Sequence, residues 1–492
     1  MKHIKDKCVD CGKNRKLKPN KLCTYCNSKQ TKCKGCTRKV KLKYENNQLC
    51  TDCYHAQQIL NINSGNQDID NLIKETHNKK FKYRLEWIPF KDFVDIKQIG
   101  SGGFSEVFTA TWTKGTLNSL YSPKEEKFGR NENVTVVLNV LKDSSNINSA
   151  FLKELQNIVE SQPNSDKRQL VQCYGVSQHP NTNNYIFVMS YMSHVSMNEY
   201  VSSNFQKITW EMKLRFLRNI VTGIKWIHEN KIIHRDIHGG NVLINNVKSD
   251  YFESFVADLG FSRPAKEDPK NSEIYRIMPY ISPEVFIKKQ YSFSSDIYSL
   301  GMIMWELTSG RRPFCNRPYD VDLAFSICDG SRPEITEDAP QCWAILMQKC
   351  WHSEPANRPS INEIYNEINS SYWNVNKIFF EAEDKRQELF KPGKFNAKHM
   401  HPHSKTHSKL LNPIIDSLHS SLYRRYKFST SGSVNSFQNV GSESFYIIPE
   451  FFKDISNLNS TSNPQISKKH TINLLLNEDN NEIKRRKVTN NN

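Results

Sequence analysis

The chain has 492 residues, of which 37% are hydrophobic, and a formal net charge of +17. Its length predicts two or more structural units, and no run approaches the ~18 consecutive apolar residues of a membrane span. The basic start has no apolar run behind it, so we expect no secretory signal and an intracellular, cytoplasmic protein. The 13 cysteines are then expected to be thiols or metal ligands instead of disulfides.

The first 55 residues contain four C-x-x-C pairs. Two such pairs complete a tetrahedral zinc site. So short a segment has too small a hydrophobic core to fold without a bound metal ion or another cross-link. We therefore expect two structural Zn²⁺ sites, paired consecutively or cross-braced. A redox role is the alternative, but a single redox site would not need four pairs. The expected ligands are Cys8, Cys11, Cys23, Cys26, Cys33, Cys36, Cys50 and Cys53.

The same segment is strongly basic, with 15 Lys and Arg against 4 Asp and Glu, a balance of +11. Basic patches bind nucleic acid, acidic proteins or anionic membrane surfaces. Because closed four-cysteine sites have no open ligand position, we expect this segment to dock partners and not to catalyse. Nucleic acid is an alternative that we do not favour, since few aromatic residues are interleaved to stack on bases.

Three further zones follow the cysteine-rich segment. Residues 56–90 form a polar connector, and residues 91–368 alternate short strand-like and longer helix-like apolar patterns. Residues 369–492 are rich in Asn, Ser, His and Lys and are expected to be mostly disordered, because they bury too little apolar area. Their basic run Lys484–Lys487 makes nuclear import an alternative to a cytoplasmic location.

Two motifs near the start of the third zone concern strands. "IGSGGFSEV", Ile99 to Val107, is a glycine-rich loop between strand-like segments. Such loops cradle phosphates, but by itself this one favours a simple hairpin turn. "VTVVLNVLK", Val134 to Lys142, predicts a strand from its β-branched residues. Its side chains alternate, so Asn139 shares a face with Leu141 and not with Lys142.

Several later motifs follow in a fixed order: "IIHRDIHGGNVLI", "VADLGFS", "PYISPE", "SSDIYSLGMIMWEL" and "NRPS". Together with the two strand motifs they resemble the eukaryotic protein kinase domain over about 280 of the 492 residues. The resemblance implies an α+β, bilobal fold with a small β-rich N-lobe and a mostly helical C-lobe. It also implies transfer of the ATP γ-phosphate to a protein, assisted by Mg²⁺, with Mn²⁺ as an alternative.

The resemblance assigns roles to single residues. Asp236 would orient the substrate hydroxyl or accept its proton, and Arg235 would meet a phosphorylated activation loop. Asp296 would brace the catalytic loop, and Arg358 would pair with Glu284. The residues implied in binding ATP and Mg²⁺ are Gly100, Gly102, Gly103, Val107, Asn139, Glu154, Asn241 and Asp258, the last two as Mg²⁺ ligands.

Asn139 is the main departure from the family, whose third strand carries a lysine that contacts the nucleotide phosphates. A three-residue slip would bring Lys142 to that position, and we prefer the register with Asn139. Because Asp236, Asn241 and Asp258 remain, we expect an active kinase with weakened turnover. The alternatives are a pseudokinase scaffold that binds nucleotide and partners, and a zinc-ribbon nucleic-acid binder with an appended kinase-like domain.

The substrate residue is expected to be Ser or Thr more than Tyr. The four residues after Asp236 read "IHGG" and lack the Ala-Ala-Arg or Arg-Ala-Ala typical of tyrosine kinases. Serine/threonine kinases usually place a lysine where His238 stands, so that position gives no support. The stretch "MPYISPE" resembles tyrosine-kinase-like serine/threonine enzymes.

Overall fold

The structure, a computed structural model, describes residues 64–78, 85–102, 105–122, 127–145, 169–193, 196–248, 251–259, 274–370, 376–391 and 408–431, with shorter pieces elsewhere. The chain divides into two units, Met1–Asp416 and Ser417–Asn492, and the fold described below belongs to the first. Within the described part, no helix combines the length and the apolar character needed to cross a membrane.

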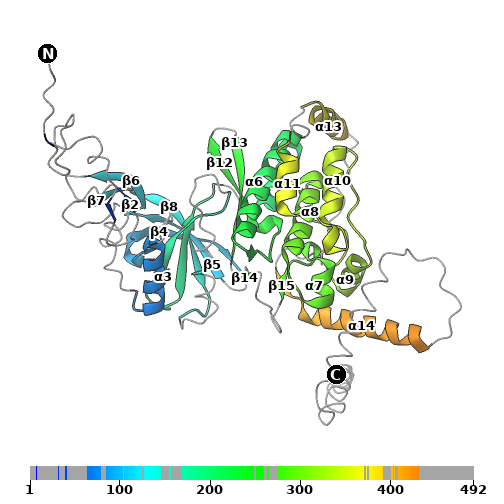
Figure 1. Ribbon diagram of the computed structural model, residues 1–492, viewed down its shortest axis with the longest axis horizontal. Coiled ribbons are helices and arrows are strands. Elements are labelled where there is room, and N and C mark those ends of the chain that lie inside the picture. Colours follow the sequence, from blue (N-terminus) through cyan, green and yellow to red (C-terminus); the bar gives the residue numbers. More distant parts are fainter. Residues whose placement is uncertain are drawn as a thin grey trace, which may run out of the picture. The chain divides into compact units, whose positions relative to one another are not determined.

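The N-terminal half of this unit is built on a six-stranded sheet with the order β3-β9-β10-β8-β5-β4 (Figure 1). Neighbours run antiparallel except β3 and β9, which are parallel. The strands are β3 (Glu86–Trp87), β4 (Phe93–Ser101), β5 (Ser105–Trp112), β8 (Val134–Leu141), β9 (Cys173–Gln178) and β10 (Tyr185–Ser190). A hairpin of β6 (Thr116–Ser122) and β7 (Lys127–Asn131) separates β5 from β8.

Strand β8 is at the centre of the sheet because it has apolar residues for both faces. Val136, Leu138 and Val140 are buried on one face, in a cluster with residues of β5 and β10. Leu141 packs on the other face, against a second cluster that includes Val176 of β9. The sequence of a strand that is covered on both faces is a nearly continuous run of apolar residues, and this is the case for β8.

Helix α3 (Gln67–Asn78) lies in the segment that the sequence predicts to be a polar connector. Asn66 caps it, since its side-chain oxygen accepts hydrogen bonds from the backbone N–H groups of Asp68 (2.9 Å) and Ile69 (3.2 Å). Ile69 and Ile73, four residues apart, share one face and are fully buried in the second cluster. The structure thus differs from the expected connector, because a few apolar residues at helical spacing attach it to the sheet.

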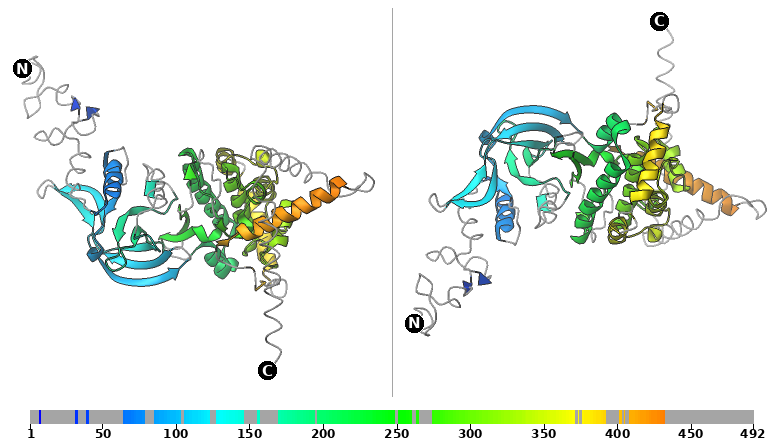
Figure 2. Two further views of the ribbon diagram at one scale, coloured as in Figure 1. Left: turned by 90° about the horizontal axis from the view of Figure 1, so that it is seen from below. Right: turned by 90° about the horizontal axis from the view of Figure 1, so that it is seen from above.

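The C-terminal half of the unit is mostly helical, and α6, α8, α10 and α11 pack side by side (Figure 1). Figure 2 shows this helical group and the sheet as separate groups. The helices are α5 (Met197–Asn204), α6 (Trp210–Glu229), α7 (Pro283–Lys288), α8 (Phe293–Ser309), α9 (Val321–Cys328), α10 (Gln341–Cys350) and α11 (Ile361–Ile368). The short strands are β11 (Ile232–Ile233), β12 (Val242–Lys248), β13 (Tyr251–Val256) and β14 (Arg263–Pro264). This arrangement confirms the predicted bilobal α+β fold.

Helix α8 is the centre of the helical half. It is buried from Ser295 to Ser309, as expected for a helix that is apolar nearly all round. Ser292 caps its start in a reciprocal capping box with Ser295, and Gly310 ends it in the left-handed conformation at φ 72°. Both ends of this helix are therefore specified locally by the sequence.

The described part of residues 369–492 differs from the disorder that the composition predicts. It contains α13 (Asn376–Leu389), β16 (Lys409–Leu410) and α14 (Asn412–Ser431). Phe379 of α13 packs near Trp210, and Glu383 accepts a hydrogen bond from the backbone N–H of Trp210 at 3.0 Å. A few large apolar residues suffice to attach these elements, although the average composition of the segment is polar.

The expected zinc ligands lie outside the described residues. In the first 55 residues the structure describes chiefly β1 (Thr31–Lys32) and β2 (Lys39–Val40), which pair antiparallel. Cys33 and Cys36 fall between these two strands in the sequence.

Candidate active site

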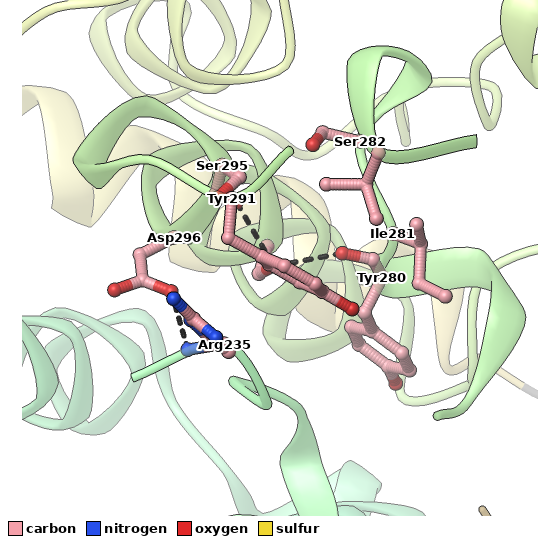
Figure 3. Close-up of a pocket in the computed structure, with 9 residues that line it drawn as sticks. Arg235, Tyr280, Ile281, Ser282, Tyr291, Ser295 and Asp296 are labelled. Carbon is pink, nitrogen blue, oxygen red and sulfur yellow. Dashed lines mark hydrogen bonds between the residues drawn. The ribbon is translucent and has the colours of Figure 1, made fainter. Parts of the chain in front are cut away.

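The loop between β11 and β12, residues 234–241, is held by the carboxylate of Asp296 at the start of α8. This buried side chain accepts hydrogen bonds from the backbone N–H groups of His234 (2.8 Å) and Arg235 (2.9 Å), and it lies 2.9 Å from Nε2 of His228. Figure 3 shows Arg235 and Asp296 side by side, next to the ring of Tyr291. The predicted bracing of the loop by Asp296 is confirmed.

Arg235 and Asp258 both adopt left-handed backbone conformations, with φ of 70° and 61°. Such conformations cost free energy for residues other than glycine and persist only where the surroundings impose them. At Arg235 the two hydrogen bonds to Asp296 supply that constraint. Strain of this kind concentrates at functional sites, which agrees with the motif reading of this loop.

His234 connects the loop to the segment that carries Asp258. Its Nδ1 accepts a hydrogen bond from the backbone N–H of Asp236 (3.3 Å), so its Nε2 carries the proton and donates to the carbonyl of Ala257 (3.1 Å). Because Ala257 immediately precedes Asp258, this neutral histidine ties the two polar motifs together.

Asp236 is nearly fully buried, and polar groups face both of its carboxylate oxygens. Asn241 donates to Oδ2 at 3.3 Å, and Nε2 of His238 lies 3.7 Å from the same oxygen. The Nε of Arg276 lies 3.4 Å from Oδ1. Burial alone would raise the pKa of Asp236, but the charge of Arg276 and the nearby His238 hold it below the ordinary value. The carboxylate is therefore ionised at neutral pH.

Asn241 and Asp258 are neighbours because β12 and β13 pair up to this point. Val242 lies opposite Val256, and the backbone N–H of Ala257 donates to the carbonyl of Asn241 at 2.8 Å. The Asn241 amide nitrogen is turned toward Asp236, which leaves its amide oxygen for a cation.

An amide oxygen beside a carboxylate is a donor set that suits Mg²⁺, which proteins bind through one or two carboxylates together with phosphate oxygens. Among the residues that the structure describes, no group of three or more His, Cys, Asp or Glu is placed to hold a metal. Asn241 and Asp258 therefore fit the cation implied by the family pattern only if phosphate oxygens supply its further ligands.

The glycine-rich loop and β8 lie next to each other in the sheet. Gly100 of β4 pairs with Val107 of β5, and Val107 pairs with Asn139 of β8. The pairing of β5 with β8 is continuous from Val134 to Leu141, so Asn139 and Leu141 share one face. That face is turned toward the cluster against which Leu259, next to Asp258, also packs.

The side-chain oxygen of Asn139 is buried and makes no hydrogen bond within the described part of the chain. Lys142, the alternative cation, lies beyond the end of β8. Its ammonium donates to the carbonyl of Gly102 at 2.8 Å and lies 3.4 Å from Oγ of Ser101, on the exposed side of the glycine-rich loop. The structure thus puts Asn139, and not Lys142, on the sheet face of Leu141.

Two largely buried acidic groups of the helical half have defined partners. Arg358 makes a bidentate ion pair with Glu284, with distances of 2.7 and 2.8 Å, which confirms the predicted pairing. Glu306 of α8 lies against Gly239, where any Cβ would come within 2.4 Å of its carboxylate oxygen. Burial raises the pKa of Glu306 to about 7, and the hydroxyl of Tyr280 donates to it at 2.8 Å.

Of the predicted site residues, the structure brings Asp236 and Asn241 into contact next to Arg235, and it ties the segment of Asp258 to them through Ala257. It also aligns Gly100, Val107 and Asn139 across three strands. Gly103 and Glu154 lie outside the described residues; Leu155, next to Glu154, is fully buried in the second cluster. The sequence motifs did not identify Arg276. It belongs to no recognised motif, and only folding brings it to Asp236.

Comparison with known proteins gives a consistent result. A family described as "Protein tyrosine and serine/threonine kinase" matches residues 93–368. A protein of Dictyostelium discoideum named as a serine/threonine-protein kinase is 29% identical over 304 residues, which are 58% of this chain and 16% of that protein.

Two further relatives match the same region. A protein of Acanthamoeba polyphaga mimivirus named as a serine/threonine-protein kinase/receptor is 29% identical over 57% of this chain and 16% of its own length. The human tyrosine-protein kinase TXK is 27% identical over 58% of this chain and 49% of its own. The matches therefore span from about a sixth to half of the length of these relatives.

Proposed function

The chain belongs to the family of protein tyrosine and serine/threonine kinases, and we propose that it transfers the ATP γ-phosphate to Ser or Thr of a protein, with turnover slowed at Asn139. Membership in the family implies use of ATP and Mg²⁺. The observation that carries the proposal is the environment of Asp236, an ionised, buried carboxylate that accepts from the side chain of Asn241, whose carbonyl in turn accepts from Ala257, the neighbour of Asp258.

In the proposed reaction each residue of the catalytic loop has a distinct task. Asp236 orients the acceptor hydroxyl and takes its proton as the phosphoryl group is transferred. Asn241 holds the Asp236 carboxylate through its amide nitrogen and, with Asp258, would hold Mg²⁺ through oxygen. The bound cation would neutralise charge on the phosphate oxygens.

Asn139 limits the rate in this proposal. Losing a charge-assisted contact costs about 1.5–3 kcal/mol, and removing one preorganised donor lowers kcat by about 10²–10³. Protein kinases work at about 1–100 s⁻¹, so slow turnover would remain measurable. The side-chain oxygen of Asn139 cannot replace a cation that pairs with phosphate.

The preference for Ser and Thr over Tyr is also part of the proposal. Two of the three relatives described above are named as serine/threonine kinases and one as a tyrosine kinase. His238, which takes the position of the usual lysine, accepts from the backbone N–H of Gly240 through Nδ1 (3.0 Å) and turns its Nε2 toward Asp236 at 3.7 Å.

The test is transfer of radiolabelled phosphate from ATP to a mixture of Ser, Thr and Tyr peptides by the full chain. Wild type and the matched control Asp322→Asn, an exposed residue of α9, are expected to transfer label to Ser or Thr. Asp236→Asn is expected to lose about 10²–10⁴-fold of the rate. Label transfer that Asp236→Asn leaves unchanged would contradict the proposal.

A pseudokinase is the second candidate, and the observation that favours it is that the Asn139 oxygen makes no hydrogen bond with any residue that the structure describes. In that case the chain would bind nucleotide without transferring phosphate. An increase of Tm with Mg²⁺ and ATP, together with no label transfer by wild type, would support this candidate over the first.

We further propose that the first 55 residues bind two structural Zn²⁺ ions. The support is the four C-x-x-C pairs and the antiparallel pairing of β1 with β2, which flank Cys33 and Cys36 in the sequence. Native mass spectrometry of the full chain is expected to find two zinc ions, and one in the double variant Cys33→Ser/Cys36→Ser. A metal-free wild-type chain would contradict the proposal.

A further inference from the structure

Residues 259–283, between Asp258 and Glu284, are called the activation segment below. Its strand β15 (Tyr275–Arg276) pairs antiparallel with β16 (Lys409–Leu410) from the C-terminal part of the chain, beside the start of α14 (Figure 1). Ile274 extends the pairing, because its carbonyl accepts from the backbone N–H of Leu411 and its N–H donates to the side chain of Asn412, both at 2.8 Å. Backbone pairing thus fixes the activation segment just before and at Arg276.

The segment that supplies β16 is itself anchored to the helical half. Leu411 and Ile415 are fully buried. The ammonium of Lys409 donates to the carbonyl of Tyr319 at 2.6 Å, and Asp416 lies 3.2 Å from the ammonium of Lys289. Apolar burial on two residues with polar contacts on either side holds β16 in place against the loss of chain entropy.

Arg276 is the residue of β15 that reaches the active site. It is buried, its Nε donates to the carbonyl of Arg235 at 2.7 Å, and the same nitrogen lies 3.4 Å from Oδ1 of Asp236. Asn241 donates to the other carboxylate oxygen. A buried guanidinium and an amide donor therefore flank the two oxygens of the Asp236 carboxylate.

The position of Arg276 conflicts with the proposed task of Asp236. A general base needs the acceptor hydroxyl within about 2.6–3.2 Å of a carboxylate oxygen. Arg276 and Asn241 each take an acceptor position of a side chain that is only 5% exposed, so the acceptor hydroxyl has little access to either oxygen in this conformation. The activation segment has to move Arg276 aside before an acceptor can take its place.

We propose that residues 408–412 form an autoinhibitory strap, which occupies the pairing edge of β15 and keeps Arg276 on Asp236. The inference rests on the proposed kinase function. Strand addition to an open edge is a common mode of peptide binding, with backbone hydrogen bonds supplying affinity. The resident strand at this edge is the chain's own, and its release frees the activation segment.

The test compares phosphate transfer by the full chain and by Leu411→Glu, which places a charge at a buried position of the strap. We expect transfer to rise about 5–150-fold, the usual range of coupling between sites. Asn412→Ala, which removes only the side-chain bond to Ile274, is expected to give a smaller rise and guards against misfolding of the first variant. Lys391→Ala, exposed and outside the strap, is the matched control and should match wild type.

A second set of variants distinguishes the effect of the strap from the effect of the Arg276 guanidinium. Arg276→Gln keeps the strand but removes the charge from Asp236, and it is also expected to raise transfer, whereas Arg215→Gln on the surface of α6 should not. Hydrogen exchange at Ile274 is expected to speed up in Leu411→Glu and not in Arg276→Gln. Phosphate transfer and hydrogen exchange at Ile274 together distinguish release of the strand from loss of the charge.

The outcomes distinguish the inference from the function on which it rests. Transfer by wild type that Leu411→Glu does not exceed, although exchange at Ile274 has accelerated, would overturn the strap and leave the kinase function standing. A lower rate in Arg276→Gln would also overturn it, since Arg276 would then assist Asp236. No transfer by wild type or by any variant would overturn both the proposed function and the inhibition.

Discussion

Strand β8 and the catalytic loop face the same proposed reaction, but their polar groups are satisfied to very different degrees. At the loop, Asp236 and the residue that braces it, Asp296 of α8, each have two or more polar partners. In β8, the oxygen of Asn139 is buried with no hydrogen bond among the described residues. Leaving a buried polar atom unpaired costs about 1–3 kcal/mol.

This difference separates the residues expected to act on the proton and the cation from the residue expected to contact the nucleotide phosphates. The groups expected to handle the proton and the cation form a connected network, so a change in one disturbs the others. The position expected to contact the phosphates lies on a separate strand, and its oxygen has no hydrogen-bond partner among the described residues, so a substitution there is expected to change the rate of transfer without disturbing the loop. The predictions below test this contrast, from the largest expected effect to the smallest.

The largest effect is expected from breaking the buried ion pair between Arg358 and Glu284. Arg358→Met leaves Glu284 without its partner at a side chain that is 13% exposed, and loss of one partner of a buried pair costs about 3–5 kcal/mol. Urea denaturation should show this loss. Arg215→Met, whose partner Glu211 is 82% exposed, is the control and should cost less than about 1 kcal/mol; equal losses would show that burial does not make the Arg358–Glu284 pair more important for stability than an exposed pair.

Asn139→Lys restores a cation on the strand that lacks one. Because one preorganised donor is worth about 10²–10³ in kcat, we expect a gain of that order in phosphate transfer, with the urea midpoint changed little or lowered. Asn131→Lys, at an exposed position of β7, is the matched control. A gain in the control, or none in Asn139→Lys, would remove Asn139 as the cause of slow turnover.

Glu306, which lies against Gly239 of the loop, should make the stability of the fold depend on pH. Its pKa is raised by burial from 4.5 to about 7, so the folded state keeps the proton that the unfolded state releases. Its contribution to stability is full below pH 4.5 and is lost as pH rises through about 7.

Glu306→Gln keeps an acceptor for Tyr280 and removes the titration, so its stability relative to wild type should increase from pH 5 to pH 8 in urea denaturation. Exposed Glu211→Gln is the control and should show no such trend. Parallel pH profiles of wild type and Glu306→Gln would contradict the raised pKa.

The smallest effect concerns the support of the sheet by α3. Ile73→Val removes one buried methylene from the second cluster and should cost about 0.5–1.5 kcal/mol. Ile345→Val, at a residue that is 41% exposed, should cost less. If the two variants were equally stable in urea, α3 would not be part of the same cooperative unit as the sheet.

The sequence motifs predicted the parts of the site whose residues are close in the chain or belong to a shared pattern. The placement of Asp296 under the loop and the pairing of Arg358 with Glu284 are confirmed, because each motif specifies a local backbone and a side chain of the required chemistry. The two segments expected to be a connector and a disordered tail contain packed helices in the described part. Average composition is a poor guide there, since Ile69, Ile73 and Phe379 are few among many polar residues.

The alternation of β8 and the caps of α8 were therefore determined by the sequence alone, because they depend on contacts between near neighbours. Only the tertiary structure decided that Arg276 lies on Asp236 and that β16 pairs with β15. These contacts join residues that are far apart in the chain, and no local spacing encodes them. Their formation depends on how the buried anchors Leu411 and Ile415 fold the chain back onto the helical half.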